Sequence, residues 1–180
     1  MKIVRMAISD VLLIRPSRLG DPRGWFSETY NLAAMDAQGL PRFVQDNESL
    51  SSSNGTVRGL HYQRGAFAQA KIIRCISGAI FDVAVDIRPG SPTFGQHVAA
   101  RIDAAEGVQM FIPAGFAHGF CTLAPDTLVQ YKVSAPYSRE SQGGIAWDDP
   151  ALAIAWPVED GVAVLSDRDR ALPRLADAAL

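Results

Sequence analysis

The sequence predicts an all-β protein, a jelly-roll β-sandwich or barrel with short peripheral helices. Short segments of alternating apolar and polar residues recur along the chain, and clusters of glycine and proline separate them. The clearest is FDVAVDIR, residues 81–88, in which Phe81, Val83, Val85 and Ile87 share one face. This period of two is typical of a half-buried strand.

The other elements follow from the same kind of pattern. Alternation predicts further strands over residues 97–103, 108–112 and 127–133, and the apolar run over residues 71–76 indicates another. Helical signals are few: residues 31–40 could form a small helix with Asn31 as N-cap and Gly39 as terminator, and the C-terminal PRLADAAL could add one turn. An immunoglobulin-like sandwich fits less well than a jelly roll, because its cysteine–tryptophan–cysteine pattern is absent from the sequence.

Composition narrows the class of protein. A chain of 180 residues suits one domain over residues 1–180, and 48% hydrophobic residues suffice for a sizeable core. The net charge of −2 argues against general nucleic-acid binding, and no apolar run is long enough to span a bilayer. Without a signal-peptide pattern, and with Cys75 and Cys121 far apart, we expect a soluble cytoplasmic protein without disulfides, and no membrane partner.

The histidines do not form a recognisable metal-ligand pattern. The sequence holds only His61, His97 and His118, and no H-x-H pair anchors a site of the metal-binding cupin type. A site built from His61 and His118, as in a metal-dependent oxygenase, is a minor alternative. We therefore expect no metal and no cofactor.

Three residues together suit proton transfer next to a ketone. His61 lies in the polar stretch RGLHYQ, Lys71 opens an apolar strand, and Tyr131 shares a strand face with valines. Taken singly, they read as a structural histidine, a solvated lysine and a core tyrosine. Taken together, they supply a base with a pKa near neutrality, a cation for the enolate and a separate acid. A base and an acid on opposite faces of a planar enolate would invert a carbon centre.

The arginines suggest an anionic ligand. Arg23, Arg58 and Arg168 lie beside turns and polar groups, where guanidinium groups could bind phosphates bidentately. Solvent exposure is the alternative reading for each of them. The segment IPAGFAHGF places His118 between phenylalanines in a glycine-punctuated turn, which is typical of a pocket mouth.

A series of long motifs then follows in order along the chain. They are DPRGWFSETY, FVQDNESLSSSNGTVRGLHYQ, QAKIIRCISGAIFDVAVDIRPGSPTFG, IPAGFAHGF, QYKVSAPYS, GGIAWDDPALAIAWP and LSDRD. Together they closely resemble the dTDP-4-dehydrorhamnose 3,5-epimerase family, over residues 21–169. The resemblance implies a metal-independent, cupin-type jelly roll that forms a homodimer with exchanged strands. It also implies epimerisation of dTDP-4-dehydro-6-deoxy-D-glucose at C5 and then C3, giving dTDP-4-dehydro-L-rhamnose.

The family's roles carry over onto matching positions. The resemblance makes His61 the base, Asp169 its partner and Tyr131 the acid, and it puts Lys71 beside the C4 oxygen. A carboxylate on the far ring nitrogen would fix the histidine tautomer and stabilise the imidazolium. The substrate-binding positions implied are Arg23 and Arg58 for the diphosphate, Phe26 and Phe120 as pocket walls, Tyr137 as the base-stacking aromatic, and Glu28, Gln45, Asn47, His118 and Arg168 for sugar and nucleotide.

One position departs from the family pattern. Gln142 in SQGGIAWDDP stands where family members commonly have glutamate. A carboxamide donates and accepts hydrogen bonds, whereas a carboxylate only accepts, so affinity or nucleotide preference could differ. The alternatives are a 3- or 5-epimerase that inverts one carbon of a related nucleotide ketosugar, and a non-catalytic sugar-nucleotide-binding cupin. The second would be expected to lack one of the four catalytic positions, all of which are present.

Overall fold

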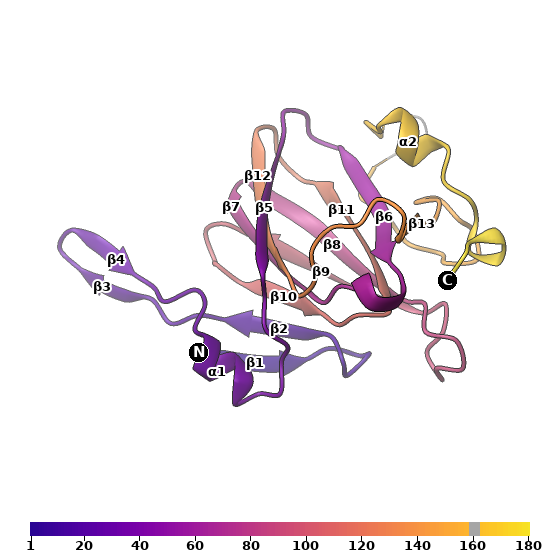
Figure 1. The fold of residues 1–180 in the computed structure, drawn as a ribbon. Coiled ribbons are helices and arrows are strands. Elements are labelled where there is room, and N and C mark those ends of the chain that lie inside the picture. Colours follow the sequence, from indigo (N-terminus) through magenta and orange to yellow (C-terminus); the bar gives the residue numbers. More distant parts are fainter. Residues whose placement is uncertain (159–162) are drawn as a thin grey trace.

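Two antiparallel sheets and a separate hairpin make up the fold (Figure 1). The structure is a computed structural model that describes residues 1–158 and 163–180. Within these residues the first sheet has six strands, in the order β1 (Lys2–Arg5), β2 (Leu12–Arg15), β10 (Gln109–Ile112), β7 (Lys71–Ser77), β12 (Thr127–Val133) and β5 (Gln45–Ser51). The second has five, in the order β13 (Gln142–Gly144), β6 (Val57–Gln63), β11 (Phe116–Thr122), β8 (Ala79–Asp86) and β9 (His97–Asp103). The all-β class and the strands expected from alternation are confirmed.

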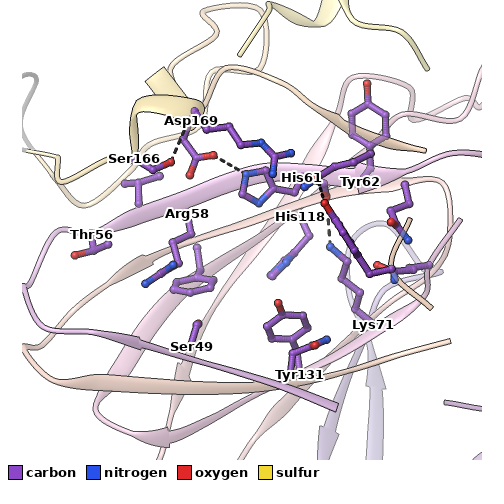
Figure 2. Close-up of a pocket in the computed structure, with 18 of the residues that line it drawn as sticks. Ser49, Thr56, Arg58, His61, Tyr62, Lys71, His118, Tyr131, Ser166 and Asp169 are labelled. Atoms are coloured by element: carbon purple, nitrogen blue, oxygen red, sulfur yellow. Dashed lines mark hydrogen bonds and ion pairs between the residues drawn. The ribbon is translucent and has the colours of Figure 1, made fainter. Parts of the chain in front are cut away.

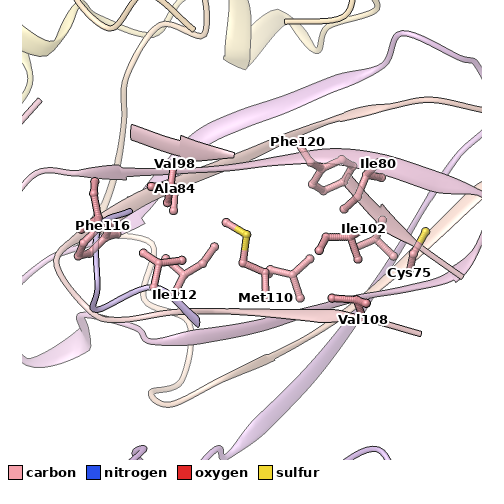
Figure 3. Close-up of a cluster of buried hydrophobic side chains, with 14 residues drawn as sticks. Cys75, Ile80, Ala84, Val98, Ile102, Val108, Met110, Ile112, Phe116 and Phe120 are labelled. Atoms are coloured by element: carbon pink, nitrogen blue, oxygen red, sulfur yellow. The ribbon is translucent and has the colours of Figure 1, made fainter. Parts of the chain in front are cut away.

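The core lies between the two sheets (Figure 3). Ile73 and Val129 project from the first sheet, and Ile80 and Ile102 project from the second; each is 0% exposed. Met110 fills the space between them. Burying such side chains stabilises the fold by roughly 1.5–3 kcal/mol each. The space between the sheets is therefore filled by apolar side chains around Met110.

Strand β8 corrects one detail of the sequence interpretation. It is buried on both faces, not half-buried. Val83 and Val85 pack on Ile145 and Leu152, which follow β13 and cover the outer face of the second sheet. The polar face therefore points between the sheets, where Asp82 is 0% exposed. The alternation correctly assigned the residues to the two faces of β8. The segment around Ile145 and Leu152 that covers the outer face has no regular pattern by which its sequence would show this.

The short helices lie at the periphery, as expected. Helix α1 (Leu32–Asp36) begins at Asn31, whose side chain accepts a hydrogen bond from Ala34 N. Gly39 has a positive φ of 71° in the turn that follows, a conformation that glycine adopts without strain. The C-terminus forms a 3₁₀ turn, η2 (Leu175–Asp177), and a second such turn, η1 (Gly65–Phe67), follows β6. No helix among the described residues is long and apolar enough to cross a membrane.

The hairpin of β3 (Leu19–Asp21) and β4 (Gly24–Phe26) extends away from both sheets (Figure 1). All six of its strand residues are exposed, including Leu19 and Phe26 at 67% and 69%. Trp25 is 55% exposed and stacks against the guanidinium of Arg18, 4.1 Å from the ring centroid. This hairpin, called the arm below, leaves apolar side chains without cover within the described chain.

Candidate active site

A cavity of about 510 Å³ opens between the sheets and adjoins the packed core at Phe120. Strands β5, β7 and β12 of the first sheet and β6, β11 and β13 of the second line it, together with the helix α2 (Asp167–Arg170). Of the fifteen residues expected at the site, twelve line this one cavity: His61, Tyr131, Lys71, Asp169, Gln45, Asn47, Arg58, His118, Phe120, Tyr137, Gln142 and Arg168. Residues from six strands and a helix therefore converge on one cavity.

His61 and Asp169 form a close pair (Figure 2). His61 Nε2 lies 2.6 Å from Asp169 Oδ1, and the histidine side chain is 30% exposed against 6% for the aspartate. Burial alone would raise the pKa of Asp169, but hydrogen bonds led by that from His61 lower it below its usual range. The aspartate is thus an ionised acceptor, Nε2 carries the hydrogen, and Nδ1 is left as the basic nitrogen.

Helix α2 positions Asp169 through its N-cap. The Ser166 hydroxyl accepts a hydrogen bond from Asp169 N at 3.1 Å, which fixes the first turn of the helix. The second carboxylate oxygen of Asp169 accepts a long bond, 3.4 Å, from Gly59 N on β6. Ser166 was missed in the sequence reading, although serine three residues before an acidic residue is a capping signal that could have identified it.

An irregularity in β6 lets Arg58 and His61 face the same cavity. Residues three apart in a regular strand point to opposite faces. Here the pairing with β11 shifts, so that three residue steps on β6 match two on β11 between His118 and Phe120. Gly59 makes this possible, because its φ is +129° and a Cβ there would lie 2.6 Å from Gly119 Cα.

Lys71 and Tyr131 approach from the other sheet. Figure 2 shows the Tyr131 phenol pointing into the cavity from β12, opposite the His61 imidazole on β6. Burial raises the pKa of Tyr131 above its usual value, so the phenol keeps its proton at neutral pH. Lys71 is 8% exposed and its Nζ lies 3.4 Å from the backbone oxygen of His61. Burial lowers the pKa of Lys71 to about 8.

A second histidine–aspartate pair lies beneath the first. His118 Nε2 lies 2.7 Å from Asp82 Oδ1, and the side chains are 9% and 0% exposed. Burial lowers the pKa of His118, while the charge of Asp82 opposes that shift. Asp82 was missed because it lies on the polar face of β8, which the alternation assigned to the less buried side of the sheet.

The mouth of the cavity is polar. The Tyr137 hydroxyl donates to Gln142 Oε1 at 2.8 Å, and Tyr137 N donates to Gln45 Oε1 at 3.3 Å. Gln45 Nε2 in turn donates to Asn47 Oδ1 at 2.8 Å. Arg58 Nε donates to the Ser51 hydroxyl at 3.0 Å, which holds its guanidinium against the wall. Tyr137 is 54% exposed, so its ring is free to meet a planar group.

Three expected residues lie outside this cavity. Arg23 and Phe26 are on the arm, Glu28 follows it, and the cavity lining includes none of them. The Arg23 side chain is 89% exposed and pairs with Asp21 at 2.6 Å. Glu28 accepts a hydrogen bond from Asn31 Nδ2 at 3.1 Å. The single chain therefore does not bring them to the site.

The histidines of the cavity are each committed to a carboxylate. Within residues 1–158 and 163–180, no group of three or more His, Cys, Asp or Glu side chains is arranged to hold a metal ion. Cys75 and Cys121 are both buried thiols. The minor alternative of a metal site built from His61 and His118 gains no support from this geometry.

Comparisons with known proteins agree with the motifs. The family model described as dTDP-4-dehydrorhamnose 3,5-epimerase matches residues 5–177. A relative of that name from Sinorhizobium fredii is 51% identical over 179 residues, which cover 96% of this chain and 88% of the relative. The structure of a Bacillus anthracis dTDP-4-dehydrorhamnose 3,5-epimerase with TDP and PPi bound has a TM-score of 0.92 and 46% identity, covering 96% of this chain and 98% of that one.

A further solved structure is that of a Legionella pneumophila dTDP-6-deoxy-D-glucose-3,5-epimerase in complex with dTDP-4-keto-L-rhamnose. It has a TM-score of 0.92 and 41% identity, and the match covers 97% of this chain and 93% of that one. The cupin-like jelly roll expected from the sequence is thereby confirmed. By sequence and by fold, the chain belongs to the dTDP-4-dehydrorhamnose 3,5-epimerase family.

Proposed function

We propose that this chain epimerises dTDP-4-dehydro-6-deoxy-D-glucose at C5 and C3, giving dTDP-4-dehydro-L-rhamnose. The observation that carries the proposal is the placement of His61 and Tyr131 on opposing sheets, with one cavity between them. Relatives that share the family name, and the Legionella structure with its bound dTDP-4-keto-L-rhamnose, support this substrate class.

His61 is the base in this proposal. Its Nδ1 removes the proton from the carbon next to the C4 ketone, and the C–H electron pair forms a carbon–carbon double bond as the carbonyl pair moves onto oxygen. The product of this step is an enolate beside an imidazolium. Asp169, 2.6 Å from Nε2, stabilises that imidazolium and holds the ring in position.

Lys71 stabilises the enolate and Tyr131 completes the inversion. The buried ammonium of Lys71 lies beside the oxygen that gains negative charge, where a low local dielectric strengthens the attraction. Tyr131 then donates its phenolic proton to the opposite face of the carbon, and the ketone re-forms. Solvent returns a proton to the phenolate and removes one from His61, so the site is ready for the second carbon.

The mouth of the cavity suits the nucleotide. Tyr137 would stack on the thymine base and Gln142, which accepts from the Tyr137 hydroxyl, keeps its amide hydrogens free to donate. Arg58 would contact the diphosphate, Phe120 would form a wall, and Gln45, Asn47, His118 and Arg168 would help bind the sugar and nucleotide. Compared with the glutamate that family members commonly have, the carboxamide of Gln142 places no negative charge at the mouth, which suits an anionic ligand.

The arm supports a homodimer with exchanged strands. Its apolar residues are uncovered, and Arg23, Phe26 and Glu28 lie away from the cavity of their own chain. In a twofold dimer each arm could enter the partner's cavity, where Arg23 would reach the diphosphate and Phe26 would form a wall. The assembly would then complete two sites that a single chain leaves open. A cytoplasmic location stays a prediction, which fractionation of the producing cells would test.

Solvent exchange tests the function. In heavy water with the ketosugar nucleotide, NMR should show deuterium entering both C5 and C3 as the L-sugar forms. Deuterium at only one carbon would identify an enzyme that inverts a single centre. No exchange at either carbon by folded protein would reject the epimerase and favour a protein that only binds sugar nucleotides.

A further inference from the structure

Asp82 is a buried carboxylate with half of its hydrogen-bonding capacity unused. It lies on β8, at the polar inner face of the second sheet, and is 0% exposed. Oδ1 accepts from His118 Nε2 at 2.7 Å, whereas Oδ2 is buried with no hydrogen-bond partner among the described residues. A buried charged oxygen left unpaired costs several kcal/mol, so a purely structural role would favour a different residue here.

The surroundings of Asp82 connect it to the reaction centre. It is not part of the cavity lining, but its bonded partner His118 is, and so is Lys71. Its neighbours on the same strand face, Ile80 and Ala84, belong to the apolar core. Asp82 therefore brings a negative charge to the floor of the cavity, behind the residues that would touch the sugar.

Lys71 is the group on which that charge acts. Burial lowers the pKa of Lys71 to about 8, and the charge of Asp82 is the opposing influence that keeps it from falling further. Among the described residues, the other titratable groups that line this cavity are His61 and Tyr62 on β6, His118 on β11, Tyr131 on β12, Asp169 on α2, Tyr137 at the mouth, and the arginines Arg58 and Arg168. Asp169 is already paired with His61 at 2.6 Å, whereas Asp82 has a buried oxygen without a partner among the described residues, and its charge opposes the effect of burial on the Lys71 ammonium.

We propose that Asp82 is a positioning residue for the epimerisation, holding the His118 ring through one oxygen and keeping the Lys71 ammonium protonated through its charge. The inference rests on the proposed function, in which Lys71 must be charged when the enolate forms. Because Nε2 of His118 donates to Asp82, Nδ1 is left as an acceptor for a hydroxyl of the sugar. The two histidines of the site thus have the same tautomer, each fixed by its own aspartate.

The test removes the negative charge of Asp82 while keeping the shape of its side chain. Asp82→Asn retains an oxygen that can accept from His118 but removes the negative charge. In the wild type, kcat/KM should fall on the alkaline side with a midpoint near the pKa of Lys71, about 8. In Asp82→Asn that midpoint should move to lower pH by about one unit or more, the usual size of the effect of a nearby charge. Asp177→Asn, which removes an equal charge from the exposed C-terminal turn, should leave the profile unchanged.

A second measurement does not depend on catalysis. NMR titration of the Lys71 side chain in the folded proteins should show its pKa lowered in Asp82→Asn relative to the wild type, with no change in Asp177→Asn. If the Lys71 titration is the same in wild type and Asp82→Asn, the proposal is overturned. If the chain has no epimerase activity, the proposed function fails, while this titration still decides whether Asp82 holds the charge on Lys71.

Discussion

His61 on β6 and His118 on β11 are register partners in one sheet, and each places its Nε2 within 2.7 Å of an aspartate oxygen. The partners come from different places: Asp169 from helix α2 and Asp82 from strand β8. Two imidazoles with fixed tautomers therefore lie side by side on the same wall. His61 is the more exposed of the two and lines the cavity as the proposed base, while His118 is nearly buried.

Replacing the base should stop proton exchange. In His61→Asn a carboxamide occupies the position of the imidazole, and it cannot accept a proton from carbon. We expect kcat to fall by about 10²-fold or more, and exchange at C3 and C5 in heavy water to fall equally. Asp169→Asn is the matched control, since it keeps the base but loses the carboxylate. It should reduce exchange without abolishing it. Deuterium exchange at the wild-type level in His61→Asn would contradict the role of His61 as the base.

Complementation should reveal arm exchange. We would co-express a His61→Asn chain with an Arg23→Glu chain, each of which should be inactive or nearly so alone. In a mixed dimer with exchanged arms, the intact arm of one chain meets the intact cavity of the other, so one site is native. Random pairing makes half of the dimers mixed, which predicts about a quarter of wild-type activity.

The contrary outcome of that experiment is equally clear. If each arm serves its own chain, every site in a mixed dimer carries a defect and activity should stay at the level of the parent variants. Sedimentation of the wild-type protein, giving dimer or monomer, provides the independent control on assembly.

Tyr137 should control affinity more than turnover. Tyr137→Ala removes the ring expected to stack on the base, a contact with a typical worth of about 1–3 kcal/mol. We expect KM to rise roughly 5- to 100-fold with kcat little changed. Tyr137→Phe keeps the ring and loses only the hydrogen bond to Gln142, so its KM should stay within a few-fold of the wild type. An equal rise of KM in both variants would show that the Tyr137 hydroxyl, and not its ring, determines affinity.

Lys71 should also affect stability as a function of pH. Its pKa is about 8 in the folded chain against 10.5 as the ordinary value, so between these pH values the unfolded chain binds more protons. The titration of Lys71 therefore increases the free energy of unfolding as the pH rises, by up to about 3 kcal/mol. Urea unfolding at about pH 7.5 and pH 10 should show this gain in the wild type relative to Lys71→Met. Parallel pH dependences would contradict the depressed pKa.

Local sequence patterns predicted much of the fold and indicated many residues of the cavity. Alternation located β9 and β12 at residues 97–103 and 127–133, and Asn31 was correctly predicted as a cap. Twelve of the residues indicated by the motifs line one cavity. These successes depend on short-range signals: strand period, capping chemistry and ordered motifs.

What the sequence did not reveal depends on long-range contacts. Asp82 was overlooked because the covering of the outer face of β8 comes from residues far along the chain, around Ile145 and Leu152. The shift in β6 that turns Arg58 to the same side as His61 arises from close approach between Gly59 and β11. Neither contact leaves a pattern within its own segment.

The stereochemical fate of deuterium in Tyr131→Phe tests the central claim most directly. The claim is that His61 and Tyr131 act from opposite faces of the sugar ring. Without the phenol, His61 should still remove the proton and return a solvent deuteron to the same face, so the recovered sugar should be deuterated with its configuration retained. Inversion at wild-type rates in Tyr131→Phe, or loss of all exchange in the folded variant, would contradict it.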